Sequence, residues 1–366
     1  MTLISLFIFL SLTFSFFTVA KILAVFHLND FESYYSAVQQ LFLKQNPYQL
    51  PLPGFPFIYP PPALFFLFPF GLLSYPLAEK LWTLFSLFCL IVSLRLLLRG
   101  LFPKATITSF LVVFGLTMIS FPTRFSLGMG QVNFFILFLI SLSFRFYRHQ
   151  RFSLAGFFLA IAAVIKITPL LCLLFFLRKK TYPLVKTFLL SCFLFLLLAF
   201  LIFGSGLTKQ YFLKVLPRLP AIGNQAYYNQ ALSGFLARLQ VNDRLACWIN
   251  YLILFLLLTI SFFKTPARQQ PFFSELGQFS FFLTVSLIAG GLTWQHHLVF
   301  LIIPFLALWG KAKKQHPSEP KTGWLVLAYF LVSANIKNPL AFSGLSLLFL
   351  SHGLYGTALV FLLAFI

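Results

Sequence analysis

Long apolar runs alternate with short clusters of Lys and Arg along almost the whole chain of 366 residues. A helix needs about 20 mostly apolar residues to cross a bilayer, and a charge at the bilayer centre costs roughly 2.5–3.5 kcal/mol. The basic clusters therefore mark helix ends. Only 9% of the residues are charged, whereas soluble domains are about 25% charged. The pattern predicts an all-α, polytopic integral membrane protein.

The basic clusters also set the orientation of the predicted helices, because positive residues accumulate in inner loops. With the N-terminus inside, about ten to twelve transmembrane or re-entrant helices result. Residues 1–366 are then one integral membrane domain of the inner (plasma) membrane, with external loops at about 27–57 and 204–244. Sixteen of the 27 basic residues are assigned to the inner side: Arg95, Arg99, Lys104, Arg145, Arg148, Arg151, Arg178, Lys179, Lys180, Lys186, Lys264, Arg268, Lys311, Lys313, Lys314 and Lys321.

A net charge of +21 is also typical of nucleic-acid binding proteins, but here the positive residues form short clusters without a basic groove. We therefore expect no nucleic-acid partner. The four cysteines lie in or beside apolar runs and have no metal-ligand spacing, so no metal site is predicted. Motifs for nucleotide hydrolysis, dinucleotide binding, α/β-hydrolases and zinc peptidases are absent, and no cofactor is expected.

Three segments depart from simple crossings. Residues 58–98 are long enough for two crossings, but the inner cluster that follows allows only an odd number, so the part opened by Tyr59 either re-enters or lies along the outer interface. Residues 124–131 are predicted to form a glycine-rich turn outside. Residues 152–177 begin and end inside, which favours two half-helices that meet at Lys166. Irregular backbone at membrane depth needs protein or water partners, so we expect a polar cavity there.

Polar residues that topology does not require gather on the outer side, which indicates an outward-facing cavity. Each also has a simpler interpretation: Arg124 and Lys166 as snorkelling cations, the His296–His297 pair as interfacial residues, Asp30 as a solvated loop carboxylate, and residues 224–230 as an ordinary loop. The set consists of Asp30, Glu32, Arg124, Gln131, Asn133, Lys166, Asn224, Gln225, Asn229, Gln230, Trp294, Gln295, His296 and His297.

The chain has six carboxylates, and four of them have simpler assignments. Glu275 and Glu319 fall on the inner side. Glu79 beside Lys80 is interpreted as a paired helix-end charge, and Asp243 beside Arg244 is interpreted in the same way. Asp30 and Glu32 remain as external carboxylates without an adjacent cation.

A carboxylate facing several cations suits displacement of a phosphate leaving group. The carboxylate takes a proton from an attacking hydroxyl, while Arg, Lys and His neutralise the departing phosphate. Such a leaving group needs little acid catalysis, so one catalytic carboxylate is sufficient. We therefore expect direct displacement with a single base.

Five motifs in sequence order resemble glycosyltransferase family 87. The first external segment carries Asp30-Phe-Glu-Ser-Tyr-Tyr, Asn46-Pro-Tyr48 and Phe57-Ile-Tyr-Pro-Pro-Pro-Ala-Leu64. The others are Gly130-Gln-Val-Asn133, Ala155-Gly156 through Lys166-Ile-Thr-Pro169, Asn229-Gln-Ala-Leu-Ser-Gly234 with Arg238, and Trp294-Gln-His-His297.

The resemblance implies a GT-C fold and a membrane transferase that moves a sugar, typically mannose, from a polyprenyl-phosphate donor to a lipid or glycan acceptor at the outer (periplasmic) face. It selects Asp30 over Glu32 as the general base. It places Lys166, His296 and His297 at the donor phosphate. Substrate-binding roles are expected for a set of polar residues: Glu32, Tyr59, Arg124, Gln131, Asn133, Lys166, Asn229, Gln230, Arg238, His296 and His297. Membrane lipids are further expected partners.

Two other functions fit the same topology. A flippase or transporter for a lipid-linked glycan also has broken helices and cations for phosphate, but its cavity would open to both faces. A nonenzymatic assembly subunit would not need Asp30. The one-sided distribution of polar residues favours the transferase.

Overall fold

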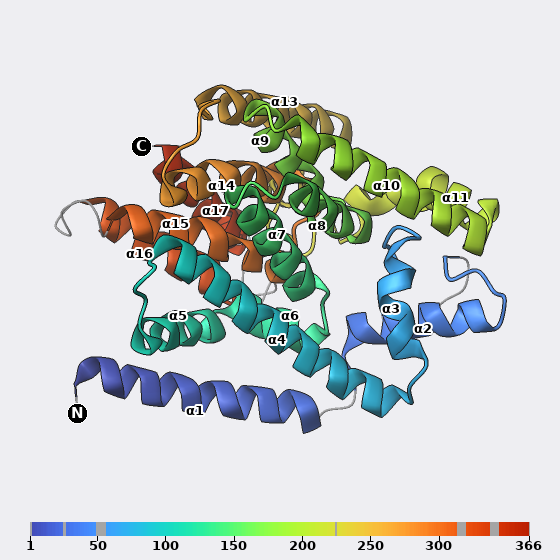
Figure 1. The fold of residues 1–366 in the computed structure, drawn as a ribbon, viewed down its shortest axis with the longest axis horizontal. Helices are drawn as coiled ribbons and strands as arrows, with labels where there is room; N and C mark the ends of the chain where they lie inside the picture. The colour runs from blue at the N-terminus through green and yellow to red at the C-terminus, as the bar shows by residue number, and fades with distance from the viewer. Residues whose placement is uncertain are drawn as a thin grey trace.

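The computed structural model describes residues 2–24, 27–48, 56–223, 225–312, 320–336 and 344–365. Within these ranges every regular secondary-structure element is a helix. One isolated β-bridge joins Asn229 to Trp294. The prediction of an all-α chain is therefore confirmed (Figure 1).

Six helical segments of the described chain are long and apolar enough to cross a membrane, or seven if a bent pair counts as one span. The bent pair is α5 (Ile107–Ile119) and α6 (Phe121–Met129), which meet at 70°. The six segments are Leu3–Phe42, which contains α1 (Leu3–Ala24) and α2 (Asn29–Phe42), α4 (Tyr75–Leu101), α10 (Tyr182–Phe203), α13 (Asp243–Lys264), α14 (Phe272–Ala289) and Leu347–Phe365, which contains α17 (His352–Phe365).

The long helices differ in what surrounds them. α14 is buried along most of its length and packs against α13, α15 (Ile302–Ala312) and α17, whereas α1, α10 and α13 expose many large apolar side chains. A helix that is apolar all round and still exposed requires lipid around it. The chain is thus a multi-pass membrane protein.

Shorter elements connect or cover these helices. They are α3 (Ala63–Gly71), α7 (Asn133–Arg148), α8 (Phe152–Ile165), η1 (Thr168–Cys172), α9 (Leu173–Arg178), α11 (Ser205–Gln210), the π-helical turn η2 (Tyr211–Val215), η3 (Leu216–Ala221), α12 (Leu232–Arg238), η4 (Gln295–Leu301), α16 (Pro320–Ser333) and η6 (Gly344–Ser351).

The two polar segments predicted as external contain short helices where the structure describes them. The first contains α2, and the second contains α11, η2, η3 and α12. Residues 124–131 likewise belong mostly to α6, and only Gly130 turns the chain, with φ 69°. Asn224 and Glu319 lie outside the described residues.

The uncertain stretch at 58–98 forms one short and one long helix. α3 has nine residues and α4 has 27. At 1.5 Å per residue α3 is roughly 14 Å long, too short to cross, whereas α4 is long enough. This agrees with the odd number of crossings predicted there.

The predicted break at Lys166 is present. α8 ends at Ile165, Lys166 is extended with φ −145° and ψ 128°, and η1 begins at Thr168. The segment then ends at α9, whose Arg178 and the following Lys179 bond to the Thr265 and Arg268 carbonyl oxygens. The two half-helices therefore meet at Lys166.

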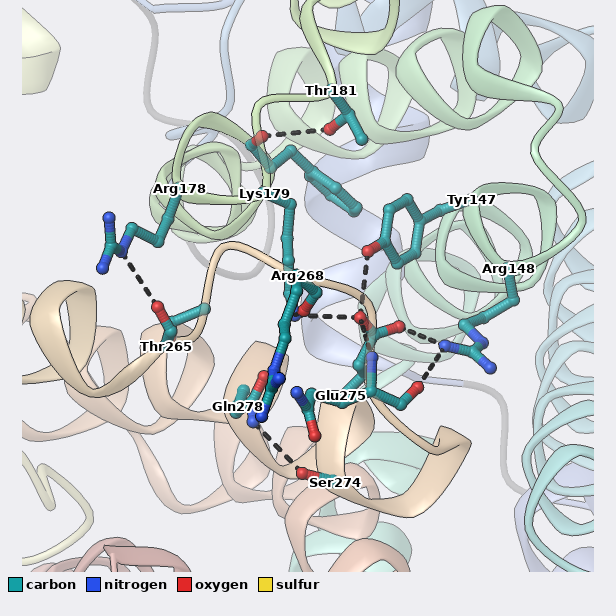
Figure 2. A network of polar contacts seen from close by, with 12 residues as sticks. Tyr147, Arg148, Arg178, Lys179, Thr181, Thr265, Arg268, Ser274, Glu275 and Gln278 are labelled. Atoms are coloured by element: carbon teal, nitrogen blue, oxygen red, sulfur yellow. Dashed lines mark hydrogen bonds and ion pairs between the residues drawn. The ribbon is translucent and has the colours of Figure 1, made fainter.

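Several basic residues assigned to the inner side surround Glu275, which is fully buried (Figure 2). Arg148 and Lys179 form ion pairs with its carboxylate, the latter at 2.9 Å, and the Tyr147 hydroxyl donates to it at 3.2 Å. Arg148 also donates to the Gln270 carbonyl oxygen at 2.7 Å. These cations thus join α7 and α9 to the start of α14, in addition to any role in orientation.

Glu79 was expected to be a helix-end charge paired with its neighbour, and this is wrong. Glu79 is 2% exposed, and its Oε1 accepts the Leu28 backbone N–H at 2.7 Å and the Tyr75 hydroxyl at 3.2 Å. The carboxylate therefore anchors the residue immediately before α2.

Candidate functional site

A cavity of 330 Å³ lies where α2, the break after α8, the end of α14 and the start of η4 meet. That volume is within the range of small-ligand sites. Its polar lining includes Asp30, Tyr59, Gln131, Lys166, His296 and His297, all of which were predicted from sequence. The structure thus brings together residues from five distant parts of the chain.

Asp30 reaches this cavity from the first turn of α2. Acidic residues are favoured at a helix N-terminus because of the helix dipole, and no Gly or Pro interrupts α2. Asp30, Ser33 and Tyr34 lie three and four positions apart, so they share one helix face, and all three line the cavity. Asp30 is 7% exposed.

Gln131 connects Asp30 to two tyrosines. Its Nε2 donates to Asp30 Oδ2, while its Oε1 accepts the Tyr59 hydroxyl at 3.1 Å and the Tyr34 hydroxyl at 3.3 Å. The two hydroxyl oxygens are 2.8 Å apart. Because the phenol protons fix which end of the amide accepts, its N–H group is directed at the carboxylate. This leaves Asp30 Oδ1 for another partner.

Gly130 allows Gln131 to approach α2. It ends α6 in the left-handed conformation, and a Cβ there would lie 2.6 Å from the Phe31 Cβ. Its carbonyl oxygen accepts the Trp82 indole N–H at 2.7 Å. Only glycine meets both the backbone and the space requirement at this position.

Lys166 faces Asp30 across the cavity, and their opposite charges attract one another. Its Nζ donates to Asn133 Oδ1 at 2.8 Å. The Asn133 amide nitrogen donates in turn to Ser126 Oγ at 3.0 Å and to the His296 carbonyl oxygen at 3.1 Å. Asn133 does not itself line the cavity. It positions the lysine from behind.

The two histidines line the cavity as neutral rings. Burial, and secondarily the positive charge of Lys166, lowers the pKa of both His296 and His297 well below its usual range. The Trp294 backbone N–H donates to His297 Nδ1 at 3.1 Å, so the neutral ring carries its proton on Nε2. The expected group of several cations is therefore corrected: among the described lining residues Lys166 is the cation, and His297 offers a neutral N–H.

The comparison with known families bears on these residues. The profile of Glycosyltransferase family 87 matches residues 57–287, more than half of the chain. The chain belongs to glycosyltransferase family 87. The match includes Gln131, Asn133 and Lys166, and it does not extend to Asp30 or the histidine pair.

One relative of this family 87 chain is the polyprenol-phosphate-mannose-dependent alpha-(1-2)-phosphatidylinositol mannoside mannosyltransferase of Mycobacterium tuberculosis. The two are 28% identical over 270 residues, which is 69% of this chain and 62% of the relative. The chain thus spans about three fifths of the relative's length.

Three predicted residues of the family 87 chain support the histidine segment from outside the cavity. The Asn229 backbone bridges to Trp294, and the neighbouring Gln230 N–H donates to the Thr293 carbonyl oxygen at 2.6 Å. The Gln230 side chain bonds to the Leu350 and Gly353 backbone. Arg238 donates to the Asn229 carbonyl oxygen and to Ser351 Oγ. Their contacts hold η4 in place.

Two other predicted residues lie away from the cavity lining. Glu32 is half-buried in α2 and does not line the cavity. Arg124 is in α6, with its guanidinium carbon 5.3 Å from the centroid of the Phe14 ring and 5.9 Å from that of Phe121. Neither contacts the Asp30–Lys166 pair.

Sequence reasoning missed Tyr34 and the apolar wall of the cavity. Tyr34 follows Asp30 by one helical turn, a signal that is visible once 29–42 is recognised as a helix. The wall consists of Tyr211, Leu216, Leu219, Pro220 and Ile222 from η2, η3 and the residue that follows. No group of three or more His, Cys, Asp or Glu side chains in the described ranges could hold a metal.

Proposed function

We propose that this family 87 chain transfers mannose from a polyprenyl-phosphate donor to a hydroxyl of a glycolipid acceptor, with Asp30 as general base and inversion at the anomeric carbon. The observation that carries the proposal is the position of Asp30 opposite Lys166 in one cavity. The mannose donor and the lipid acceptor are supported by the activity that the relative's name describes.

In the proposed reaction the acceptor oxygen forms a bond to the anomeric carbon as the bond from that carbon to the phosphate oxygen breaks. The hydroxyl proton moves to Asp30, and the leaving phosphate takes the bonding electron pair. Lys166 stabilises the growing phosphate charge, and His297 Nε2–H is a further donor. Positioned donors of this kind act most strongly away from water. One base and one displacement invert the anomeric carbon.

The lipid part of the donor fits the apolar lining. Ile165, Ile167, Leu170 and Leu171 flank Lys166, and residues 216–222 form the facing wall. A phosphate held at Lys166 would therefore place the first isoprene units against apolar side chains, where burial stabilises them.

Location at the outer face of the plasma membrane is supported by charge. Glu275 and its basic partners lie at one end of α14, and Ser286 of the cavity lies roughly 16 Å along the same helix. The positive-inside rule assigns the basic end to the inner side. The cavity would then open toward the periplasmic side.

The test is sugar transfer by the purified protein, given synthetic polyprenyl-phosphate mannose and a membrane-lipid extract, with products identified by mass spectrometry. Asp30→Asn should lower turnover at least about 100-fold. Glu32→Gln is the matched comparison on the same helix. If Glu32→Gln alone abolished sugar transfer, Glu32 would be assigned as the base. If the wild-type protein gave no product with any polyprenyl-phosphate sugar, a carrier would be favoured.

A further inference from the structure

A second cavity, of 360 Å³, has an almost entirely apolar lining, and we call it the groove. It lies between α5, α6, α15 and α16, with one wall from η4. Its lining includes Leu116, Pro122, Leu298, Ile302, Phe305 and Val326. In a membrane protein such a cavity accepts an aliphatic chain, because hydrocarbon packs against it without desolvating polar groups.

The groove adjoins, through η4, the first cavity, which contains Asp30 and Lys166 and is the catalytic cavity of the proposed function. His296 and His297 line the catalytic cavity, and the next two residues, Leu298 and Val299, line the groove. The apolar walls beside Lys166 come from η1, η3 and neighbouring residues, which do not contribute to the groove. If the donor chain occupies those walls, the groove is left for a different lipid.

Arg124 supplies a positive charge next to the groove. It directly follows the groove residues Pro122 and Thr123, and its charge acts on the hydroxyl of Tyr329 on the facing wall. Its Nε is buried and has no hydrogen-bond partner in the described part of the chain. Guanidinium groups bind phosphate by paired hydrogen bonds. The charge and the apolar groove together match a lipid phosphate with its chain.

Gly128 lies in the chain between Arg124 and Gln131, the residue that contacts the base. Gly128 lies one helical turn after Arg124 and so on the same face of α6. A Cβ at Gly128 would meet no atom within 4 Å, although glycine inside a helix costs roughly 1 kcal/mol relative to alanine. Met129, the last residue of α6, lies roughly 8 Å from Arg124 along the helix axis, and Gln131, which contacts Asp30, follows two residues later. That separation suits a sugar headgroup.

We propose that Arg124 and the groove bind the acceptor as a glycophospholipid. Its aliphatic chain lies between α5, α6, α15 and α16, its phosphate pairs with Arg124, and its sugar headgroup passes Gly128 to present a hydroxyl to Asp30. This placement rests on the proposed function, since it treats the occupant as the acceptor. The lipid site itself is measurable without any transfer.

The binding test uses a phosphatidylinositol probe with a diazirine-bearing acyl chain, at low mole fraction in phosphatidylcholine nanodiscs that contain the full chain. Crosslinks should fall in the elements that line the groove, residues 107–129, 298–309 and 320–333. Arg124→Gln should reduce them about tenfold, and Arg124→Lys should retain most of them. Asp30→Asn should crosslink like wild type, because it alters chemistry and not this site.

Two comparison probes decide what the groove recognises. A diazirine-bearing diacylglycerol, which lacks phosphate, should label weakly and should not respond to Arg124→Gln. A diazirine-bearing phosphatidylcholine that labels as strongly as the phosphatidylinositol probe would make the groove a bulk-lipid site and overturn the acceptor assignment. Labelling confined to other helices would overturn the site altogether.

Kinetics separate this inference from the proposed function. With dipalmitoyl phosphatidylinositol mannoside as acceptor, Arg124→Gln and the groove-filling Val326→Phe should each raise the acceptor KM about tenfold and leave the donor KM unchanged. The deacylated headgroup should not respond to Val326→Phe. Absence of transfer in wild type would contradict the proposed function, whereas Arg124-dependent crosslinking would still establish the lipid site. Transfer with unchanged acceptor KM in both variants would contradict the site.

Discussion

At the scale of single residues, the Gln131 amide gives the two carboxylate oxygens of Asp30 different roles. The amide holds Oδ2, while Tyr34 and Tyr59 hold the amide. Both phenols bond to Gln131 and to each other, so each would act on the carboxylate through Gln131. This arrangement leaves Oδ1 as the oxygen that can take the proton of an acceptor hydroxyl.

We therefore expect Gln131→Ala to lower kcat about tenfold, since a hydrogen bond to a charged group is typically worth about 1.5–3 kcal/mol. Tyr34→Phe and Tyr59→Phe should each cost less, because the remaining phenol still orients the amide. Steady-state mannose transfer at saturating donor is the measurement. In the Gln131→Ala background the two tyrosine changes should have little further effect; full additivity would show that the phenols act independently of Gln131.

The neutral histidines give a dependence of stability on pH. An unfolded histidine binds a proton below about pH 6.5, and His296 and His297 do not when folded, because burial lowers their pKa. The unfolding free energy should therefore fall as pH falls, by at most about 1.4 kcal/mol per pH unit for each histidine.

The measurement is the Tm of the protein in nanodiscs between pH 7 and pH 5.5. The Tm of wild type should drop with acidification, and that of the double variant His296→Gln/His297→Gln should drop less. Identical pH slopes for the two proteins would show that these histidines take up protons in the folded state.

At the scale of elements, the junction of α6 and α7 determines how α2 is placed. Gly130 packs against Phe31 and accepts from Trp82 of α4, so three helices meet at one backbone turn. Gly130→Ala should displace α2, lower transfer at least tenfold and lower the Tm, because both the positive φ and the 2.6 Å approach oppose a Cβ.

Gly277 provides the matched comparison for this prediction. It lies inside α14, and a Cβ there meets nothing within 4 Å. Gly277→Ala should leave the Tm unchanged or raise it, since alanine favours a helix interior by roughly 1 kcal/mol. A Gly130→Ala protein with wild-type Tm and transfer would mean that α2 tolerates the displacement.

Element boundaries also show how much of the fold could be predicted from the sequence. Apolar runs and basic clusters predicted the helical membrane architecture and the break at Lys166, because both follow from the cost of charge and open backbone in lipid. They did not predict α2, since its partly exposed, amphipathic pattern has no long apolar run. The roles of Glu79 and Asn133 were also inaccessible, because their partners Leu28, Lys166 and His296 are distant in the chain.

At the scale of the whole molecule, polar groups are concentrated at two ends of the same helices. α7 begins at Asn133 behind the cavity and ends at Arg148 beside Glu275, roughly 22 Å away. α14 connects the same two ends. The Glu275 network (Figure 2) thus joins one end of the helices whose opposite ends contribute to the candidate active site.

Removing the charge of Glu275 should therefore affect stability far more than chemistry. Glu275→Gln leaves the buried Lys179 and the partly buried Arg148 without their carboxylate, and breaking one partner of a buried ion pair typically costs about 3–5 kcal/mol. We expect a strongly lowered Tm in nanodiscs.

Arg145 is an exposed cation one turn earlier on α7, and Arg145→Gln should have little effect on the Tm. The folded fraction of Glu275→Gln should keep a near-wild-type donor KM, because the network lies roughly 16 Å from the cavity; a raised donor KM with an unchanged Tm would show instead that the network acts on the site directly.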